Sequence, residues 1–337
     1  MTARPTRTTL RLTSHGRSPS VERALTDFGA EESFARAAKR FEEHYGWEIG
    51  RTTVLRVVEE RAHEAERYVE ERLQESRKAY STSTIDRPGV TTMLVELDGC
   101  EIRTGTLSPS GTDEKTAVRG APKQTRTETW RDVRLAFARV LGEADRTYVG
   151  AMDDYDVVTE QLFSAAVDRG MSELTQVVGV ADGGNGLREA LDAKFQNLRF
   201  VLDRPHFKSH LYETADAIGL AGAEREEWVR AAVNECEIGG ANVVATAVLA
   251  YEGNGEERAR RLGGYLERFA DAVDYEKVRE SGYPTASGEI ESAHRYIPQK
   301  RLKIPGACWS PDTINPMLAL RVMRENGWWG DFWASSP

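Results

Sequence analysis

Three carboxylates stand in this sequence where a fold can use them for chemistry. Asp98 and Asp182 each end an apolar, strand-like run, at 91–97 and 176–181, and each precedes a glycine. Strand ends of an α/β sheet open into a crevice, and a following glycine leaves room for a ligand. Asp-Gly is also a common turn pair, which by itself explains either aspartate. Two such positions in one sheet favour a shared site only modestly.

The third carboxylate, Glu291, lies in a segment that begins like a capped helix. Glu289 precedes it by two residues, so on a helix the two side chains point about 200° apart and cannot share a site. Glu291 shares its face with Ser287, His294 and Arg295, a polar stripe that suits a metal and a phosphate. Glu289 is explained by a favourable interaction with the helix macrodipole.

Three carboxylates are enough to hold the metal ions that catalyse reactions of phosphodiesters. Two Mg²⁺ ions about 3.5 to 4 Å apart activate a water or a 3′-hydroxyl on one side of the phosphate and stabilise the leaving oxygen on the other. Magnesium prefers hard oxygen ligands and keeps several waters, so two or three carboxylates suffice. The loop DGGNGL after the second strand lacks both G-x-G-x-x-G and a Walker lysine, so we expect no nucleotide cofactor.

The elements that position these residues begin with an N-terminal helical region, expected at 31–80. One helix from about residue 33 and a second from 52 to 78 flank a short turn that contains two glycines. This is the outline of a helix-turn-helix, although most helical hairpins of this size only pack. Its second helix would present four residues to a DNA groove: Arg51, Thr52, Thr53 and Arg56.

That second helix also carries an apolar seam from Leu55 to Leu73, spaced alternately by three and four residues. The seam nearly matches a heptad, which predicts packing against its own domain or against a second subunit. Residues 1–30 hold four arginines before the first acidic residue, Glu22, and we expect a mobile basic arm there.

From residue 90 the periodicity changes to that of strands. The pattern predicts a hairpin of 91–97 and 100–104 turning at Asp98-Gly99, a long polar loop at 105–127, and a mixed α/β sequence of elements at 130–140, 154–169, 176–181, 186–195 and 198–202. Beyond this, 204–286 looks helical almost throughout. That segment has 10 basic and 15 acidic residues, so it carries −5 of the net charge of the chain.

The composition excludes some classes of protein. The 337 residues have a formal charge of −9 and no apolar run of the roughly 18 residues that a membrane span needs. The first residues lack the apolar region of a secretory signal, and three cysteines without a CxxC fit a reducing cytoplasm. The acidic balance argues against wrapping nucleic acid over most of the surface, but it allows a local basic channel.

Several motifs together resemble the ISKra-type bacterial insertion-sequence transposases, relatives of the Mutator-like DDE transposases. The resemblance covers most of 90–335 and rests on four stretches, LVELDG (94–99), VVGVADGGNGL (177–187), FVLDRPHFKSHL (200–211) and SGEIESAHRYIPQKRLKIPGACWSPDTINPMLALRVMRENGWWGDFW (287–333). It implies that Asp98, Asp182 and Glu291 form a DDE triad that binds two Mg²⁺ or Mn²⁺ ions on an RNase H-like fold.

The resemblance also implies how the chain is divided. The RNase H-like core would consist of 90–203 and 287–337, with 204–286 as an all-α insertion before the last catalytic helix. His206 belongs to the Asp-x-x-His motif of the family. With His294 and Arg295 it is expected to support the metal ligands or to contact DNA, and we expect the same of the basic residues beside Glu291, which are Lys300, Arg301 and Lys303.

Two departures from the family pattern stand out. The second aspartate is often followed by Gly-Ala-x-Trp, whereas this chain has Gly183, Gly184 and Asn185, which changes the pocket beside the metal but removes no ligand. Many relatives carry a cysteine-containing, zinc-ribbon-like segment upstream, and no cysteine precedes Cys100 here.

The leading hypothesis is a metal-dependent DNA transposase that cleaves the ends of its element and joins the freed 3′-hydroxyl to target DNA. We expect double-stranded DNA as partner, a homo-oligomer on DNA, no membrane, and a nucleoid-associated location in the cytoplasm of a prokaryote. Two alternatives stay open: a transposase-derived DNA-binding or regulatory protein without catalysis, and a general RNase H-like nuclease.

Overall fold

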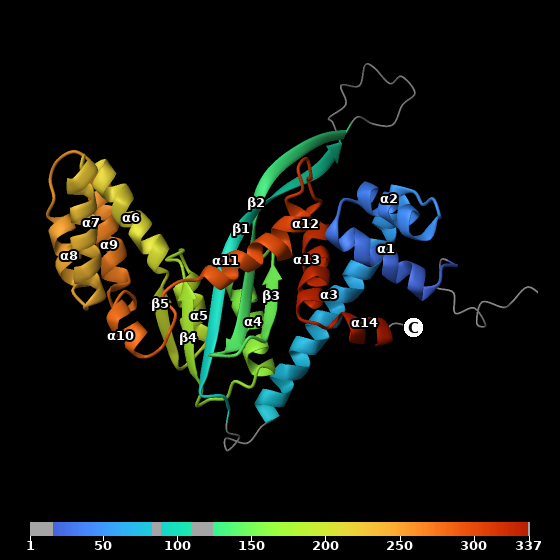
Figure 1. The fold of residues 1–337 in the computed structure, drawn as a ribbon, viewed down its shortest axis with the longest axis horizontal. Coiled ribbons are helices and arrows are strands. Elements are labelled where there is room, and N and C mark those ends of the chain that lie inside the picture. The colour runs from blue at the N-terminus through green and yellow to red at the C-terminus, as the bar shows by residue number, and fades with distance from the viewer. Residues whose placement is uncertain (1–15, 83–88, 110–123, 336–337) are drawn as a thin grey trace, which may run out of the picture.

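A five-stranded mixed sheet forms the centre of the protein, whose computed structural model describes residues 16–82, 89–109 and 124–335 (Figure 1). Its strands are β1 (Thr92–Pro109), β2 (Gln124–Val140), β3 (Arg146–Ala151), β4 (Gln176–Ala181) and β5 (Leu198–Leu202). The order across the sheet is β3-β2-β1-β4-β5. β1, β2 and β3 are antiparallel, whereas β4 and β5 run parallel to β1. The predicted mixed α/β layout is confirmed.

Helices cover both faces of this sheet. α4 (Tyr155–Asp168) and α5 (Leu187–Lys194) lie on one face, where a methyl group added to Gly179 of β4 would touch Leu191 of α5. α11 (Gly288–His294) and α13 (Ile314–Glu325) lie on the other face, where one added to Gly150 of β3 would touch Leu318 of α13. Because β4 is covered on both sides, it is apolar at nearly every position.

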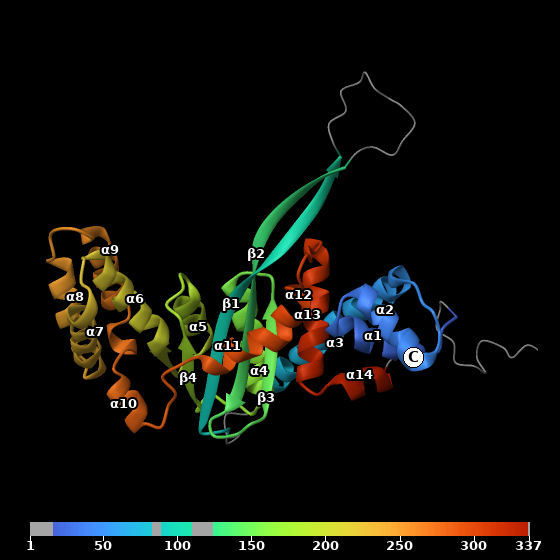
Figure 2. The ribbon, with the colours of Figure 1, turned by 45° about the horizontal axis from the view of Figure 1, so that its top comes forward.

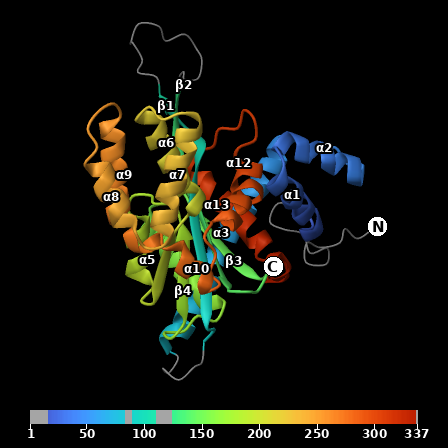
Figure 3. The same cartoon turned by 60° about the vertical axis from the view of Figure 1, so that its left-hand side comes forward.

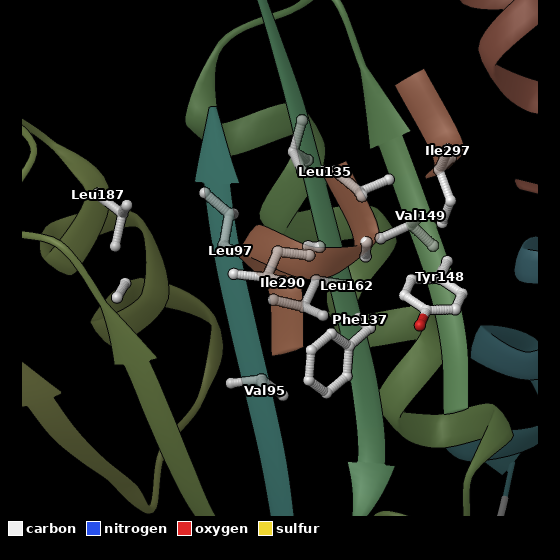
Figure 4. Close-up of a cluster of buried hydrophobic side chains, with 14 of the residues drawn as sticks. Val95, Leu97, Leu135, Phe137, Tyr148, Val149, Leu162, Leu187, Ile290 and Ile297 are labelled. Atoms are coloured by element: carbon white, nitrogen blue, oxygen red, sulfur yellow. The ribbon is translucent and has the colours of Figure 1, made fainter. Parts of the chain in front are cut away.

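The core fills the space between the sheet and these helices. Val95, Leu97 and Phe137 of the central strands are fully buried, as are Leu162 of α4 and Ile290 of α11 (Figure 4). Val95 and Leu97 share one face of β1, whereas Glu96 between them points to the opposite face, where its carboxyl accepts from Ile290 N of α11. The sheet therefore fixes where α11 can lie.

The predicted turn at Asp98-Gly99 is wrong. β1 runs through both residues without a break, and they pair with Leu135 and Arg134 of β2. Pairing with a long second strand satisfies the backbone over the whole length, and this outweighs the turn preference of Asp-Gly. Both strands also extend well into the predicted 105–127 loop, of which 110–123 lie outside the described residues. β3 was not predicted.

Beyond the sheet, β1 and β2 continue as a two-stranded ribbon (Figure 2). Its base is joined to the C-terminal region because Gly105 N donates to Trp309 O at 2.8 Å and Trp309 N donates to Arg103 O at 3.1 Å. The ribbon thus starts from a fixed base.

The N-terminal region is helical, with α1 (Pro19–Glu31), α2 (Phe34–Tyr45) and α3 (Arg51–Thr82). Ser18 and Ser33 cap the first two helices by accepting from Val21 N and Arg36 N. The expected mobile arm at 1–30 is therefore corrected for residues 19–30, which form a helix with Leu25 buried; residues 1–15 lie outside the described residues.

The apolar seam of α3 is used inside the chain. Val58, Ala62, Ala65 and Leu73 are buried, and α3 packs on α13, α1 and α4. The sequence left open whether the seam packs within its own domain or against a second subunit. In the structure it packs against helices of the same chain.

Five α-helices and one 3-10 helix, Ala270–Ala272, form the segment between β5 and α11, in agreement with the helical pattern of 204–286. The α-helices are α6 (Arg204–Ala217), α7 (Gly222–Glu237), α8 (Ala241–Leu249), α9 (Glu256–Arg268) and α10 (Tyr275–Glu280), and they lie beside the β5 edge of the sheet (Figures 1 and 3). Phe269 stacks on Phe200 of β5 with ring centroids 5.9 Å apart, and the Tyr275 hydroxyl donates to Leu202 O at 2.9 Å. These contacts attach the helical segment to the sheet.

After α11 the chain continues through a π-helical turn, Arg295–Gln299, into α12 (Lys300–Leu302); α14 (Trp329–Ser335) ends the described chain. Pro298 lies inside the π turn and has no N–H to donate to the preceding turn. The buried guanidinium of Arg321 donates to the carbonyls of Tyr296 and Ile297 and so holds this turn. No helix in the described ranges is long and apolar enough to span a membrane.

Candidate active site

Strand register brings three aspartates level with one another. β1 and β4 pair from Thr92 with Gln176 to Glu96 with Val180, and the same register continued by two residues brings Asp98 level with Asp182. β4 and β5 pair up to Ala181 with Leu202, and one further step brings Asp182 level with Asp203. Neighbouring strands are about 4.8 Å apart and residues in register share a face, so the three side chains leave the sheet side by side.

Asp98 lies on the face of β1 that α11 covers. Its Oδ1 accepts from Gly99 N at 2.7 Å, and its Oδ2 lies 3.7 Å from Nε2 of His294 on α11. Burial raises the pKa of Asp98, His294 opposes this shift, and the nearby Asp182 carboxylate adds to it. The shift of Asp98 thus shows that a second carboxylate lies close to it.

Asp182 sits in a tight glycine turn at the end of β4. Its Oδ1 accepts from Gly184 N at 3.0 Å. A Cβ atom on Gly183 would lie 2.4 Å from the Tyr265 ring of α9, so this position has no room for a side chain. The glycines that follow the second aspartate therefore allow the insertion to approach the site closely.

Glu291 faces the strand ends from α11. It forms a cluster with Asp203 and His206, in which one ligand atom of each residue lies within 4.8 Å of the others. His206 is close enough to both Asp182 and Glu291 for their charges to raise its pKa. Asp98 is thus near Asp182, and His206 is near both Asp182 and Glu291. Within the described residues, however, the cluster of possible metal ligands contains Glu291 with Asp203 and His206, and neither Asp98 nor Asp182.

Asp203 is fully buried and already has its hydrogen bonds. Its Oδ1 accepts from His206 N at 2.8 Å and contacts His206 Nδ1 at 3.1 Å, and its Oδ2 accepts from Ser287 N and Oγ at 2.7 and 2.6 Å. Burial alone would raise the pKa of Asp203, but these bonds outweigh it and lower the pKa to about 2. The Asp203 bond raises the pKa of His206 to about 9, against the effect of burial. His206 is therefore a cation at neutral pH.

A second buried carboxyl lies two residues before Asp98. Glu96 is 1% exposed, and its Oε2 accepts from Ile290 N of α11 at 2.9 Å. Within the described residues its Oε1 has no hydrogen-bond partner. Burial raises the pKa of Glu96 to about 8, the Ile290 N–H opposes this shift, and Glu289 adds to it. Glu96 is thus largely neutral at pH 7.

His294 is a buried polar residue beside Asp98. Its ring is 2% exposed, and neither ring nitrogen has a hydrogen-bond partner within the part of the chain that the structure describes. Burial lowers its pKa, against the attraction of Asp98. A neutral imidazole 3.7 Å from Asp98 is placed to orient this carboxylate, and its burial excludes the alternative of a DNA contact.

Glu289 points elsewhere, as its helical offset from Glu291 predicts. Its carboxylate pairs with Arg139 at 2.6 Å and with Arg146 at 2.9 Å. These ion pairs attach α11 to β2 and β3, and they give Glu289 a structural role outside the carboxylate site.

Of the four basic residues predicted beside Glu291, two are exposed and two contact the N-terminal helices. Arg295 and Lys303 are exposed, while Lys300 pairs with Glu31 of α1 at 2.5 Å. Arg301 is 2% exposed, donates to Gly29 O at 2.8 Å, and its guanidinium lies 4.5 and 4.7 Å from the ring centroids of Phe34 and Trp309. The expectation that Arg301 contacts DNA is corrected, because the side chain is enclosed between the N-terminal helices and the core.

The helix-turn-helix candidates lie on the first turn and a half of α3. Arg51, Thr52 and Arg56 are exposed and Thr53 is half-buried. They are separate from the carboxylate site, which lies on β1, β4 and α11.

Glu96 was missed by sequence reasoning, and Asp203 was noted only as part of a motif. A charged residue inside the apolar run TMLVEL was a signal for Glu96, because such runs are buried. Asp203 followed by a proline two positions later carries an N-cap signature, since Asp caps helices and Pro favours their first turn.

No protein-family model matches the chain, and no curated protein matches it. Among solved structures, a match is found to a chain of the "Crystal structure of the Mos1 Strand Transfer Complex" at 12% sequence identity, covering 81% of this chain and 80% of that chain, with a TM-score of 0.18. A TM-score of 0.18 is too low to indicate a shared fold or function.

Proposed function

We propose that the protein is a metal-dependent DNA transposase with an RNase H-like core, in which Asp98, Asp182 and Glu291 form a DDE triad. The observation that carries the proposal is the strand register, which aligns Asp98 with Asp182 under the helix that bears Glu291. The resemblance of the sequence motifs to the ISKra-type transposases supports it independently.

The donor set fits Mg²⁺ or Mn²⁺. Asp98, Asp182 and Glu291 supply hard carboxylate oxygens, and the raised pKa of Asp98 reflects burial and repulsion that a divalent cation would relieve. When bound, the ions would activate the attacking oxygen and stabilise the leaving oxygen of a phosphodiester. The protein holds these carboxylates on a rigid sheet and on a helix that packs against it, which limits the reorganisation needed for reaction.

The cationic neighbours suit a phosphate substrate. His206 is positively charged at neutral pH and half-exposed beside Glu291, while Arg295 and Lys303 are exposed on the segment that follows α11. We propose that DNA lies along this side of the sheet. The net charge of −5 in 204–286 disfavours DNA on the outer surface of the insertion. Handling two element ends would require a second subunit.

Single substitutions of the triad test the proposal. Asp98→Asn, Asp182→Asn and Glu291→Gln should each reduce Mg²⁺- or Mn²⁺-dependent cleavage of element-end DNA to the level without metal, because each removes a charged ligand. Asp274→Asn is the control, since this carboxylate caps α10 and pairs with Lys277. Full activity in all three triad variants would refute the assignment.

Two other functions remain as outcomes of the same assay. A general RNase H-like nuclease would cleave DNA without end specificity and without joining strands. A DNA-binding protein derived from a transposase would bind DNA but show no metal-dependent cleavage. We favour the transposase because all three carboxylates are present and because Asp98 and Glu291 lie on β1 and α11, which the bond from Ile290 N to Glu96 joins.

A further inference from the structure

Two buried carboxyl groups hold the first turn of α11. Asp203, at the end of β5, accepts two hydrogen bonds from Ser287, the residue before the helix. Glu96, inside β1, accepts from the N–H of Ile290 in the same turn at 2.9 Å. The first N–H groups of a helix have no partner within the helix, so these acceptors decide where the helix starts.

We propose that Glu96 and Asp203 position Glu291 by holding α11 on the sheet, and that Asp203 is not a metal ligand. This inference rests on the proposed function for its catalytic consequence, but the contacts themselves are independent of it. Glu291 directly follows Ile290, whose N–H Glu96 accepts. A shift of this turn would therefore move Glu291 relative to Asp98, which lies on the same strand as Glu96.

The need for such a clamp follows from the connectivity. The chain leaves the sheet after Asp203, passes through five α-helices and one 3-10 helix, and returns at Ser287. Asp203 joins the two ends of this segment, and Arg204 N donates to Thr285 O at 2.9 Å beside it. The insertion thus emerges from a closed base. The bonds from Asp203 to Ser287 and from Glu96 to Ile290 attach the turn before Glu291 to the sheet and not to the five α-helices.

Saturation of Asp203 argues against its acting as a metal ligand, even though it lies in a cluster with His206 and Glu291. Each carboxylate oxygen accepts about two hydrogen bonds, and both oxygens of Asp203 have two contacts within 3.1 Å. A cation at Asp203 would have to displace bonds from Ser287 or His206. Asp98 and Asp182 each accept only one backbone bond that the structure records, so they keep free oxygens.

The experiment compares four variants of the full-length protein. Asp203→Asn keeps the size but loses an acceptor oxygen, and Glu96→Met removes the acceptor at similar length. Glu96→Gln keeps an oxygen that can accept from Ile290 N. Asp274→Asn is the control, because Asp274 is also buried and caps α10 through Lys277 N but does not touch α11. Circular dichroism melting shows that each variant is folded.

Two measurements separate the clamp from the proposed function. Hydrogen exchange of the 287–290 amides without metal should speed up about tenfold or more in Asp203→Asn and Glu96→Met, and stay near wild type in Glu96→Gln and Asp274→Asn. Calorimetric Mn²⁺ titration should show affinity weakened by about tenfold or more in the first two variants with unchanged stoichiometry, and higher Mn²⁺ should restore their cleavage activity.

Unchanged exchange in both Asp203→Asn and Glu96→Met would overturn the clamp. Loss of one bound ion in Asp203→Asn with unchanged exchange would identify Asp203 as a ligand and would also overturn the proposal. A wild-type protein that binds no Mn²⁺ would refute the proposed function, and the exchange rates would still decide whether the two carboxyl groups hold α11.

Discussion

Replacing Glu96 by glutamine should change how the stability of the protein depends on pH. The pKa of Glu96 is raised from 4.5 to about 8 because the carboxyl group is buried. Below pH 4.5 the group is protonated in both the folded and the unfolded protein, so its full contribution to stability is present. Above pH 4.5 the unfolded chain loses this proton, while the folded protein keeps it until the pH reaches about 8. The contribution to the free energy of unfolding is therefore lost as the pH rises through 8.

The expected magnitude follows from the two pKa values. Each pH unit between 4.5 and about 8 costs about 1.4 kcal/mol, which makes about 4 kcal/mol between pH 5 and pH 8. Glutamine has a similar shape, can accept from Ile290 N, and does not titrate. The free energy of unfolding of Glu96→Gln should therefore rise by about 4 kcal/mol relative to that of wild type between pH 5 and pH 8.

Urea unfolding followed by tryptophan fluorescence at several pH values, with EDTA present, measures the difference. Asp203→Asn is the control, because the pKa of Asp203 is lowered from 3.8 to about 2. The contribution of Asp203 to the free energy of unfolding is lost only as the pH falls through 2. The difference in free energy of unfolding between Asp203→Asn and wild type should therefore stay constant between pH 5 and pH 8. Parallel profiles for wild type and Glu96→Gln, within 1 kcal/mol, would show that the buried carboxyl is not neutral.

Three further predictions test packing and charge. Arg321→Met should destabilise the protein by about 1 to 3 kcal/mol in urea unfolding, because the buried carbonyls of Tyr296 and Ile297 lose their donor while Glu31 keeps its ion pair with Lys300; an unchanged stability would contradict this. Gly183→Ala should cost about 1 to 3 kcal/mol and reduce cleavage, because the added methyl group would meet Tyr265, and a second change, Tyr265→Leu, should recover much of the loss in thermal melts and activity assays. Lys303→Ala should weaken DNA binding and lower the salt slope of log K by about 1 in anisotropy titrations; an unchanged slope would remove Lys303 from the interface.

Much of the fold could be predicted from local patterns. The strands at 176–181 and 198–202 were placed correctly because each is a short apolar run between polar residues. The helices of 204–286 follow from their periodic apolar stripes. β3 was missed, and 98–99 was taken for a turn, because neither feature can be recognised without the partner strand that pairs with it.

The candidate site divides in the same way. The choice of Asp98, Asp182 and Glu291 as catalytic carboxylates stays a prediction. The helical offset between Glu289 and Glu291 does predict their different neighbours, since Glu289 pairs with Arg139 and Glu291 lies in a cluster with Asp203 and His206. It did not distinguish Lys303 from Arg301, which lie on one short basic run. Enclosure of Arg301 depends on Gly29 and Phe34, which come from the distant N-terminal helices, as well as on the nearby Trp309.

The sequence by itself determined the strands β4 and β5 and most of the helices, because these depend on near neighbours in the chain. Only the tertiary structure decided that Asp98 is level with Asp182, that Asp203 is saturated, and that Glu96 holds α11. The reason is physical: register and burial are set by hydrogen bonds and packing between segments far apart in the chain, and no local pattern encodes those partners.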